Sequence, residues 1–194
     1  MPKQKTDRDT ILRKSLDVFL QKGYYHTKFS DLGEACGMEK SHFYYYFRSK
    51  EDLMLAVLEF TYRNVKQHIL EKAYDENYTP QQRLAKMMQN TVRLHASTSQ
   101  GCLMGNTVLG TTGIEPKFQG ILRRYFEGWV AALSHVFQAQ YAEDKAQQLA
   151  QESIQEIQGS VMFVRLYNDP NYLEEAANRI VERLSQAQVQ TLSD

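Results

Sequence analysis

Apolar side chains recur every three or four residues along nearly the whole chain. The first such stretch, at about residues 7–22, has its apolar positions at Ile11, Leu12, Leu16, Phe19 and Leu20. This spacing places them on one face of an amphipathic helix. It also predicts helices at about 49–74, 80–98, 115–140, 144–167 and 171–189. No segment alternates with a period of two, so we expect an all-α protein.

Prolines and glycines separate these stretches, as they do between helices. The four prolines stand at positions 2, 80, 116 and 170. Lys22 and Gly23 are typical of a helix C-terminus, because the cation suits the dipole and glycine suits the cap. The segment 101–113 carries four of the ten glycines, and we expect a short helix framed by turns there.

A helix-turn-helix is predicted at residues 27–47. Thr27 is a suitable N-cap for its first helix, and Ser30 or Asp31 could also satisfy the free N–H groups there. Gly37 supplies the tight reversal between the two helices. The second helix covers about residues 39–45, with Phe43 and Phe47 facing inward. The side chains left to face outward are Lys40, Ser41, His42, Tyr44 and Tyr45. Such groups suit phosphate oxygens and base edges.

The formal net charge of the 194 residues is zero, but the charge is unevenly distributed. Residues 1–50 hold ten Lys and Arg against six acidic residues, and the other 144 residues carry the opposite excess. A basic first quarter indicates a polyanionic partner for that end of the chain.

One pattern of spaced residues is more specific. It consists of Gly23-Tyr24, Thr27, Asp31-Leu32, Ala35, Gly37-Met38, Phe43-Tyr44-Tyr45-Tyr46-Phe47 and Ser49-Lys50-Glu51-Asp52-Leu53. Over about residues 8–55, in order and without gaps, the chain resembles the N-terminal domain of the TetR family of transcriptional regulators. The resemblance implies a protein of about nine helices, in which a three-helix DNA-binding domain (1–50) precedes a larger ligand-sensing and dimerisation domain (51–194).

The resemblance also implies roles for individual residues. Phosphate contacts are expected from Thr27, Tyr45, Tyr46 and Lys50. Groove contacts are expected from Lys28, Lys40, Ser41, His42 and Tyr44, with His42 evenly balanced between a base contact and a bystander. Lys50 also lies at a predicted helix start, where free N–H groups attract phosphate. Three residues depart from the family pattern: Gly33 replaces an alanine, Glu39 a Ser or Thr cap, and Ser41 a glycine.

Methionine and aromatic residues are concentrated between residues 80 and 167. Such side chains can line an adaptable ligand cavity, although each one alone is more readily explained as ordinary core. The ligand-binding residues that we predict are His95, Cys102, Met104, Asn106, Tyr125, Trp129, Phe163 and Tyr167. The resemblance implies that an apolar or aromatic small molecule binds there and makes the protein release its DNA operator.

Cys102 has two interpretations. A thiol at the start of a short helix can have a lowered pKa and react with electrophiles. The alternative, which residue type alone favours, is a small buried hydrophobe at a tight turn. Cys36, inside the predicted helix-turn-helix, is expected to be inert packing.

The last two helices carry apolar stripes that include Leu149, Ile154, Ile157, Val161, Val164, Leu173, Ile180, Leu184 and Val189. Two copies of such a pair can form a four-helix dimer interface, which the family also uses. A homodimer places two recognition helices about 34–36 Å apart, as a palindrome in double-stranded DNA requires.

Other classes of function lack support in the sequence. There is no phosphate-binding glycine loop, metal-ligand cluster or nucleophile elbow, so we predict neither an enzyme nor a cofactor or metal. With no long apolar run, no secretory leader and only two separated cysteines, we expect a cytoplasmic protein without membrane contact. The alternatives are a DNA-binding regulator controlled by a protein partner, an activator, and a helical adaptor without DNA.

Overall fold

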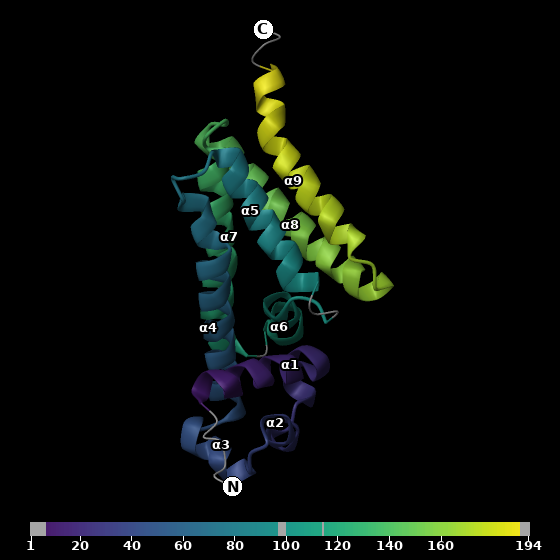
Figure 1. The fold of residues 1–194 in the computed structure, drawn as a ribbon. Coiled ribbons are helices and arrows are strands. Elements are labelled where there is room, and N and C mark those ends of the chain that lie inside the picture. The colour runs from purple at the N-terminus through teal and green to yellow at the C-terminus, as the bar shows by residue number, and fades with distance from the viewer. Residues whose placement is uncertain (1–6, 97–99, 114, 191–194) are drawn as a thin grey trace. The chain divides into compact units, whose positions relative to one another are not determined.

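The computed structural model describes residues 7–96, 100–113 and 115–190, except for the side chains of residues 40–42, 96 and 186–190. The helices are α1 (Arg8–His26), α2 (Phe29–Cys36), α3 (Lys40–Tyr46), α4 (Lys50–His68), a 3-10 helix (Leu70–Tyr74), α5 (Pro80–Ala96), α6 (Leu103–Thr111), α7 (Pro116–Phe137), α8 (Glu143–Tyr167) and α9 (Asn171–Gln190) (Figure 1). The described residues contain no strand. The predicted all-α class with about nine helices is therefore confirmed.

Contacts divide the chain into two compact units. The first unit comprises Met1–Arg63 and Leu103–Leu122, and the second comprises Asn64–Cys102 and Arg123–Asp194. Grouping by contacts thus places α6 with the N-terminal helices. The predicted functional division after residue 50 is a different partition, and it stays a prediction.

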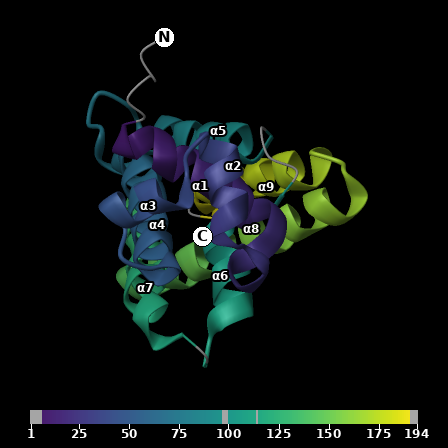
Figure 2. The same ribbon diagram turned by 90° about the horizontal axis from the view of Figure 1, so that it is seen from below.

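In the first unit, α1 packs against α2 and α6, and α2 packs against α3 (Figures 1 and 2). The large side chains that are almost completely buried here are Ile11, Leu12, Phe19, Leu32, Phe43, Phe47, Leu53, Met54, Leu58 and Phe118. Short helices of seven or eight residues are marginal alone. Burial of Leu32 and Phe43 on this core therefore stabilises α2 and α3.

Two helices end differently from the prediction. The α1 assignment runs past Gly23 to His26, but Gly23 has φ 74° and ψ 166° and breaks the helix with a kink. The predicted helix at 49–74 is interrupted at Ile69, whose φ of −122° and ψ of −59° are not helical, and continues as the 3-10 helix. Apolar periodicity passes through both breaks, because buried residues stand before and after each one: Leu20 and Tyr24 around Gly23, and Val65 and Leu70 around Ile69.

In the second unit, α9 packs against α8 and α5, and α5 packs against the 3-10 helix. The α8 and α9 stripes are used within the chain. Their buried members are Leu149, Ile154, Ile157, Val161, Leu173, Ile180 and Leu184. Val164 is half-buried, and the side chain of Val189 lies outside the described residues. These stripes alone are therefore no argument for a partner chain.

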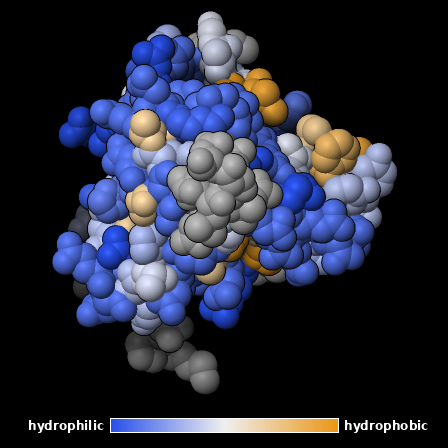
Figure 3. Space-filling model, turned by 90° about the horizontal axis from the view of Figure 1, so that it is seen from above, coloured by the Kyte–Doolittle hydropathy of each residue, from blue (hydrophilic) through white to orange (hydrophobic). Residues whose placement is uncertain are grey.

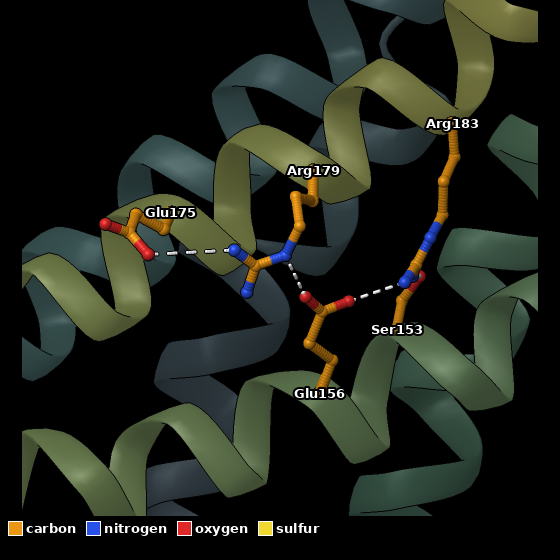
Figure 4. A network of polar contacts seen from close by, with 5 residues as sticks. All are labelled: Ser153, Glu156, Glu175, Arg179 and Arg183. Carbon is orange, nitrogen blue, oxygen red and sulfur yellow. Dashed lines mark hydrogen bonds and ion pairs between the residues drawn. The ribbon is translucent and has the colours of Figure 1, made fainter.

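A polar network also joins α8 to α9 (Figure 4). The Glu156 carboxylate accepts hydrogen bonds from Arg179 and from Arg183, and Arg183 also donates to the Ser153 hydroxyl at 2.9 Å. Arg179 makes a longer ion pair of 3.8 Å with the exposed Glu175. Glu156 is thus the centre of an interhelical network.

No helix in the described part of the chain is both long enough and apolar enough to cross a membrane.

Candidate functional site

The turn between α2 and α3 has the geometry that its sequence predicts. Gly37 adopts the left-handed conformation (φ 64°, ψ 34°), and its N–H donates to the Glu34 carbonyl. The next N–H, from Met38, donates to the Gly33 carbonyl at 2.9 Å. This pair of bonds is a Schellman motif, which ends α2 and redirects the chain into α3.

The start of α2 differs from the preferred prediction. Thr27 is not its N-cap: Thr27 is buried, and its hydroxyl donates to the Gly23 carbonyl at 2.7 Å. Lys28 occupies the N-cap position, and the Asp31 carboxylate accepts from the Lys28 N–H at 2.8 Å. Asp31 also pairs with Lys22 of α1 at 2.7 Å, and these contacts lower the pKa of its carboxyl. Asp31, at the third helical position, therefore satisfies an N–H group at the start of α2, and it also ties α2 to α1.

Gly33 has a steric reason to be glycine. A Cβ at this position would lie 2.8 Å from the Met38 carbonyl oxygen. Real Cβ atoms do not come this close to a backbone oxygen without displacing it. The departure from the family pattern at residue 33 thus belongs to the shape of the turn.

The α3 helix has buried phenylalanines on one side and exposed tyrosines on the other. Phe43 and Phe47 are fully buried, whereas Tyr44 is 51% exposed and Tyr45 is 84% exposed. The centroid of the Phe29 ring lies 5.4 Å from that of the Tyr44 ring, so Tyr44 packs against α2. Tyr46 is half-buried, and Lys28 is exposed. Predicted contacts from Lys40, Ser41 and His42 fall on side chains outside the described residues.

Lys50 has a role that local sequence analysis missed. Its ammonium group donates to the carbonyls of Tyr24 at 2.8 Å and Thr27 at 3.1 Å, with Tyr25 at 3.5 Å. It thereby caps carbonyls at the C-terminal end of α1, beyond the kink at Gly23. No local signal could have shown this, because Lys50 and Tyr24 are 26 residues apart. The phosphate contact from Lys50 stays a prediction, and a phosphate would compete with these carbonyls for the ammonium group.

Burial shapes the titration of the groups around Lys50. It raises the pKa of Tyr24 to about 12, helped by the carboxylates of Glu115 and Glu51. Burial also lowers the pKa of Lys50, while Glu115 opposes that shift. Tyr24 therefore stays a neutral phenol, and its ring packs edge-on against Phe118 at 5.0 Å.

Three of the predicted ligand-binding residues come together in the second unit. Tyr125 is completely buried and shares hydrogen bonds with the Cys102 thiol and the Trp129 indole. Burial is the main reason why the pKa of Tyr125 lies well above its usual value, and Cys102 adds to it. Cys102 is itself only 6% exposed. The cluster Cys102–Tyr125–Trp129 thus places a thiol and a phenol in contact with each other in the buried part of the second unit.

The other predicted ligand-binding residues are dispersed. His95 is buried, and burial lowers its pKa to about 4. Met104 is fully buried and Asn106 half-buried, both on α6 of the first unit. Phe163 and Tyr167 are exposed on α8, and their rings are stacked with centroids 5.9 Å apart. The described residues hold no group of three or more His, Cys, Asp or Glu that could bind a metal ion.

Family comparisons match both parts of the chain. Residues 11–57 match the sequence model of bacterial regulatory proteins of the tetR family. Residues 80–179 match that of the C-terminal domain of LmrA/YxaF-like transcriptional regulators. Together the two models cover the helix-turn-helix and most of the second unit.

Individual proteins are similar over most of their length. An uncharacterized HTH-type transcriptional regulator of Lactococcus lactis is 27% identical over 86% of this chain and 87% of its own length. The HTH-type transcriptional repressor DhaR of a Mycobacterium species is 28% identical over 63% of this chain and 61% of its own. A TetR transcriptional regulator from Legionella pneumophila has the same fold, with a TM-score of 0.82 at 21% identity, covering 94% of this chain and 99% of that one.

Proposed function

Because the chain belongs to the TetR family of bacterial transcriptional regulators, we propose that it is a homodimeric repressor that binds a palindromic operator and leaves it when a small molecule binds. Members of this family are regulators and not enzymes. The observation that carries the proposal is the arrangement of α3 in the helix-turn-helix. Tyr44 and Tyr45 are exposed, while Phe43 and Phe47 on the other side are buried. As a bacterial DNA-binding protein it acts in the cytoplasm, where its operator lies.

Exposure and position support DNA contacts from the described residues: Tyr45 and Tyr46 contact phosphates, and Lys28 and Tyr44 contact the major groove. For Lys40, Ser41 and His42, whose side chains lie outside the described residues, the groove contacts rest on the family resemblance alone. The hydroxyl of Thr27 and the ammonium group of Lys50 are engaged inside the protein. We therefore assign these two residues the task of holding α2 in position for its own phosphate contacts.

Selection of bound DNA from a random pool tests this assignment. A palindromic sequence should emerge, and Tyr45→Ala should weaken binding to all sequences. His42→Ala and Tyr44→Ala should instead change the preferred bases. Tyr74→Ala is the matched control, because Tyr74 is also half-exposed but lies in the second unit. A dimer that selects no DNA and captures another protein would instead indicate an adaptor.

The effector site that we propose is the Cys102–Tyr125–Trp129 cluster. Its aromatic walls suit an apolar or aromatic molecule, and its thiol suits a mild electrophile. Operator release by an electrophile such as N-ethylmaleimide should then be lost in Cys102→Ser and retained in Cys36→Ser. Equal release from both variants would show that the thiol at 102 is packing only.

The dimer contact that we propose uses the outward side of α8 and α9. Five large apolar side chains remain exposed near the connection between these helices: Met162, Phe163, Leu166, Tyr167 and Tyr172. We call them the α8–α9 patch. The three rings lie within 5.9 Å of one another. Hydrophobic residues gather at the right edge of Figure 3, the side on which this connection lies in Figure 1. An exposed patch of this kind marks an interaction surface.

A further inference from the structure

The first unit contains a cleft of about 300 Å³ that the proposed effector site does not include. The cleft lies where α6 packs on the end of α1, and Met54 of α4 contributes to its wall. All its lining residues belong to the first unit. Cys102, Tyr125 and Trp129 belong to the second. The cleft therefore shares no residue with the proposed effector site, and its volume is at the low end of the range for small-molecule pockets.

One wall is a single face of α6. Its lining residues are Leu103, Asn106, Thr107, Gly110 and Thr111. These positions follow the i, i+3, i+4, i+7 spacing, so they lie on one side of the helix. A Cβ built at Gly110 meets no atom within 4 Å. The cleft is open at Gly110 because this position of the face carries no side chain.

The opposite wall is the kinked end of α1. It is built from Phe19 and the residues 23–26 that follow the break in the helix. A Cβ at Gly23 would also meet nothing within 4 Å, and its φ of 74° disfavours any other residue. Phe19 and Tyr24 supply aromatic surface, and both are nearly fully buried. The two glycines thus face a space that aromatic rings border.

The lining also indicates what could occupy the cleft. It includes no Lys, Arg, Asp or Glu, and His26 is its one basic side chain, so neither a carboxylate nor a permanent cation is there to compensate a charged ligand. Thr107 and Thr111 are at most 4% exposed, and each hydroxyl already donates to a carbonyl of its own helix. A hydroxyl that has donated its hydrogen can still accept. The walls therefore favour a neutral ring that carries a hydrogen-bond donor.

From these features we propose that the cleft between α1 and α6 binds a small neutral aromatic molecule with one O–H or N–H donor. The donor bonds to a threonine oxygen of α6, and the ring lies against Phe19 and Tyr24. This site is additional to the effector site of the second unit. It adjoins His26, two residues before the N-cap position of α2 at Lys28.

Titration of the whole protein with 4-methylphenol, without DNA, tests the proposal by ¹H–¹⁵N NMR. A ligand of this size should bind with a Kd of about 1 mM, and saturable shifts should map to residues 23–26 and 106–111. Toluene, which lacks the donor, should bind several-fold more weakly, and benzoate should not bind. Shifts that do not saturate, or that map around Tyr125 instead, would overturn the proposal.

Two variants make the test specific. Gly110→Leu fills the cleft and should weaken 4-methylphenol binding at least about tenfold. Gly120→Leu is its control, because Gly120 is also an open, exposed helical glycine of the first unit and does not line the cleft. Thr107→Val and Thr111→Val each keep the shape and remove one acceptor, so 4-methylphenol should lose about two- to tenfold in affinity in at least one of them while toluene loses none. Equal affinity in Gly110→Leu and Gly120→Leu would contradict the site, whatever the protein does with DNA.

Discussion

The ammonium group of Lys50 lies 2.8 Å from the Tyr24 carbonyl oxygen and 4.5 Å from the centroid of the Tyr24 ring. One side chain at the start of α4 thus satisfies the backbone at the end of α1 and packs on its aromatic ring. Because α2 begins only a few residues later, Lys50 fixes the direction in which the chain enters the helix-turn-helix.

Lys50→Ala should therefore destabilise the protein and should not simply remove a phosphate contact. Leaving half-buried carbonyls without a donor costs about 1–3 kcal/mol of unfolding free energy, measurable by urea denaturation. Operator affinity should fall while its dependence on salt stays the same. A salt slope lower by about one, with unchanged stability, would identify Lys50 as a phosphate ligand instead.

Gly33→Ala should destabilise the helix-turn-helix although alanine is the better helix former. The new methyl carbon would lie 2.8 Å from the Met38 carbonyl oxygen and would have to displace it. This should lower the unfolding free energy by about 1–3 kcal/mol. Gly120→Ala is the control and should stabilise by up to about 1 kcal/mol, since its Cβ meets nothing. Thermal melts of the two variants should move in opposite directions, and a shared direction would argue against the steric explanation.

Glu156→Ala should weaken the packing of α9 on α8. The change leaves Arg179 and Arg183 without the carboxylate that both contact, and we expect a loss of about 1–2 kcal/mol in the unfolding free energy. Glu175→Ala removes only a 3.8 Å pair with a 69% exposed side chain and should be nearly neutral. Chemical denaturation measures the unfolding free energy of both variants. Equal losses in the two would show that the network contributes little to stability.

Acid should destabilise the second unit through His95. The folded protein holds the pKa of His95 at about 4, below the 6.5 of an unfolded chain. The unfolded state therefore takes up the proton first, and stability falls as the pH drops from about 6.5 to 4. The loss reaches about 3 kcal/mol. His95→Gln should flatten the profile of unfolding free energy over this range, and His68→Gln, at an exposed site, should not.

Leu166→Glu should shift the protein towards monomers. Leu166 is 66% exposed in the single chain and belongs to the α8–α9 patch, so a carboxylate there would be buried at the proposed contact at a high cost. Gln151→Glu adds the same charge at another exposed position of α8 and should leave the dimer intact. Light scattering after gel filtration distinguishes them, and a dimer that persists in Leu166→Glu would rule out this patch as the contact.

Local patterns predicted the helices and the central turn well. The spacing of Leu32 and Cys36 and the position of Gly37 were enough to place α2 and its end, because caps and amphipathic faces depend on neighbours in sequence. The same reasoning erred at Thr27. Its hydroxyl donates to the Gly23 carbonyl, and Thr27 is buried. Helix propensities could not predict this, because they do not include tertiary burial.

The ligand-binding residues show where residue type alone fails. Tyr125 and Tyr167 were equally good predictions, since both are aromatic and lie on helices. The structure buries Tyr125 beside Cys102 and leaves Tyr167 exposed next to Phe163. Which face of a helix meets the core depends on how the helices pack, and packing involves residues far apart in sequence.

The sequence by itself determined the helical class, the helix-turn-helix and the family, because each follows from spacing within about fifty residues. Only the tertiary structure decided three further features. Lys50 donates hydrogen bonds to carbonyls at the end of α1, position 33 has no room for a side chain, and the missing side chain at Gly110 leaves a cleft open against α1. The physical reason is common to all three. A hydrogen bond, a steric limit and an empty volume each depend on distances between atoms, and folding alone sets those distances.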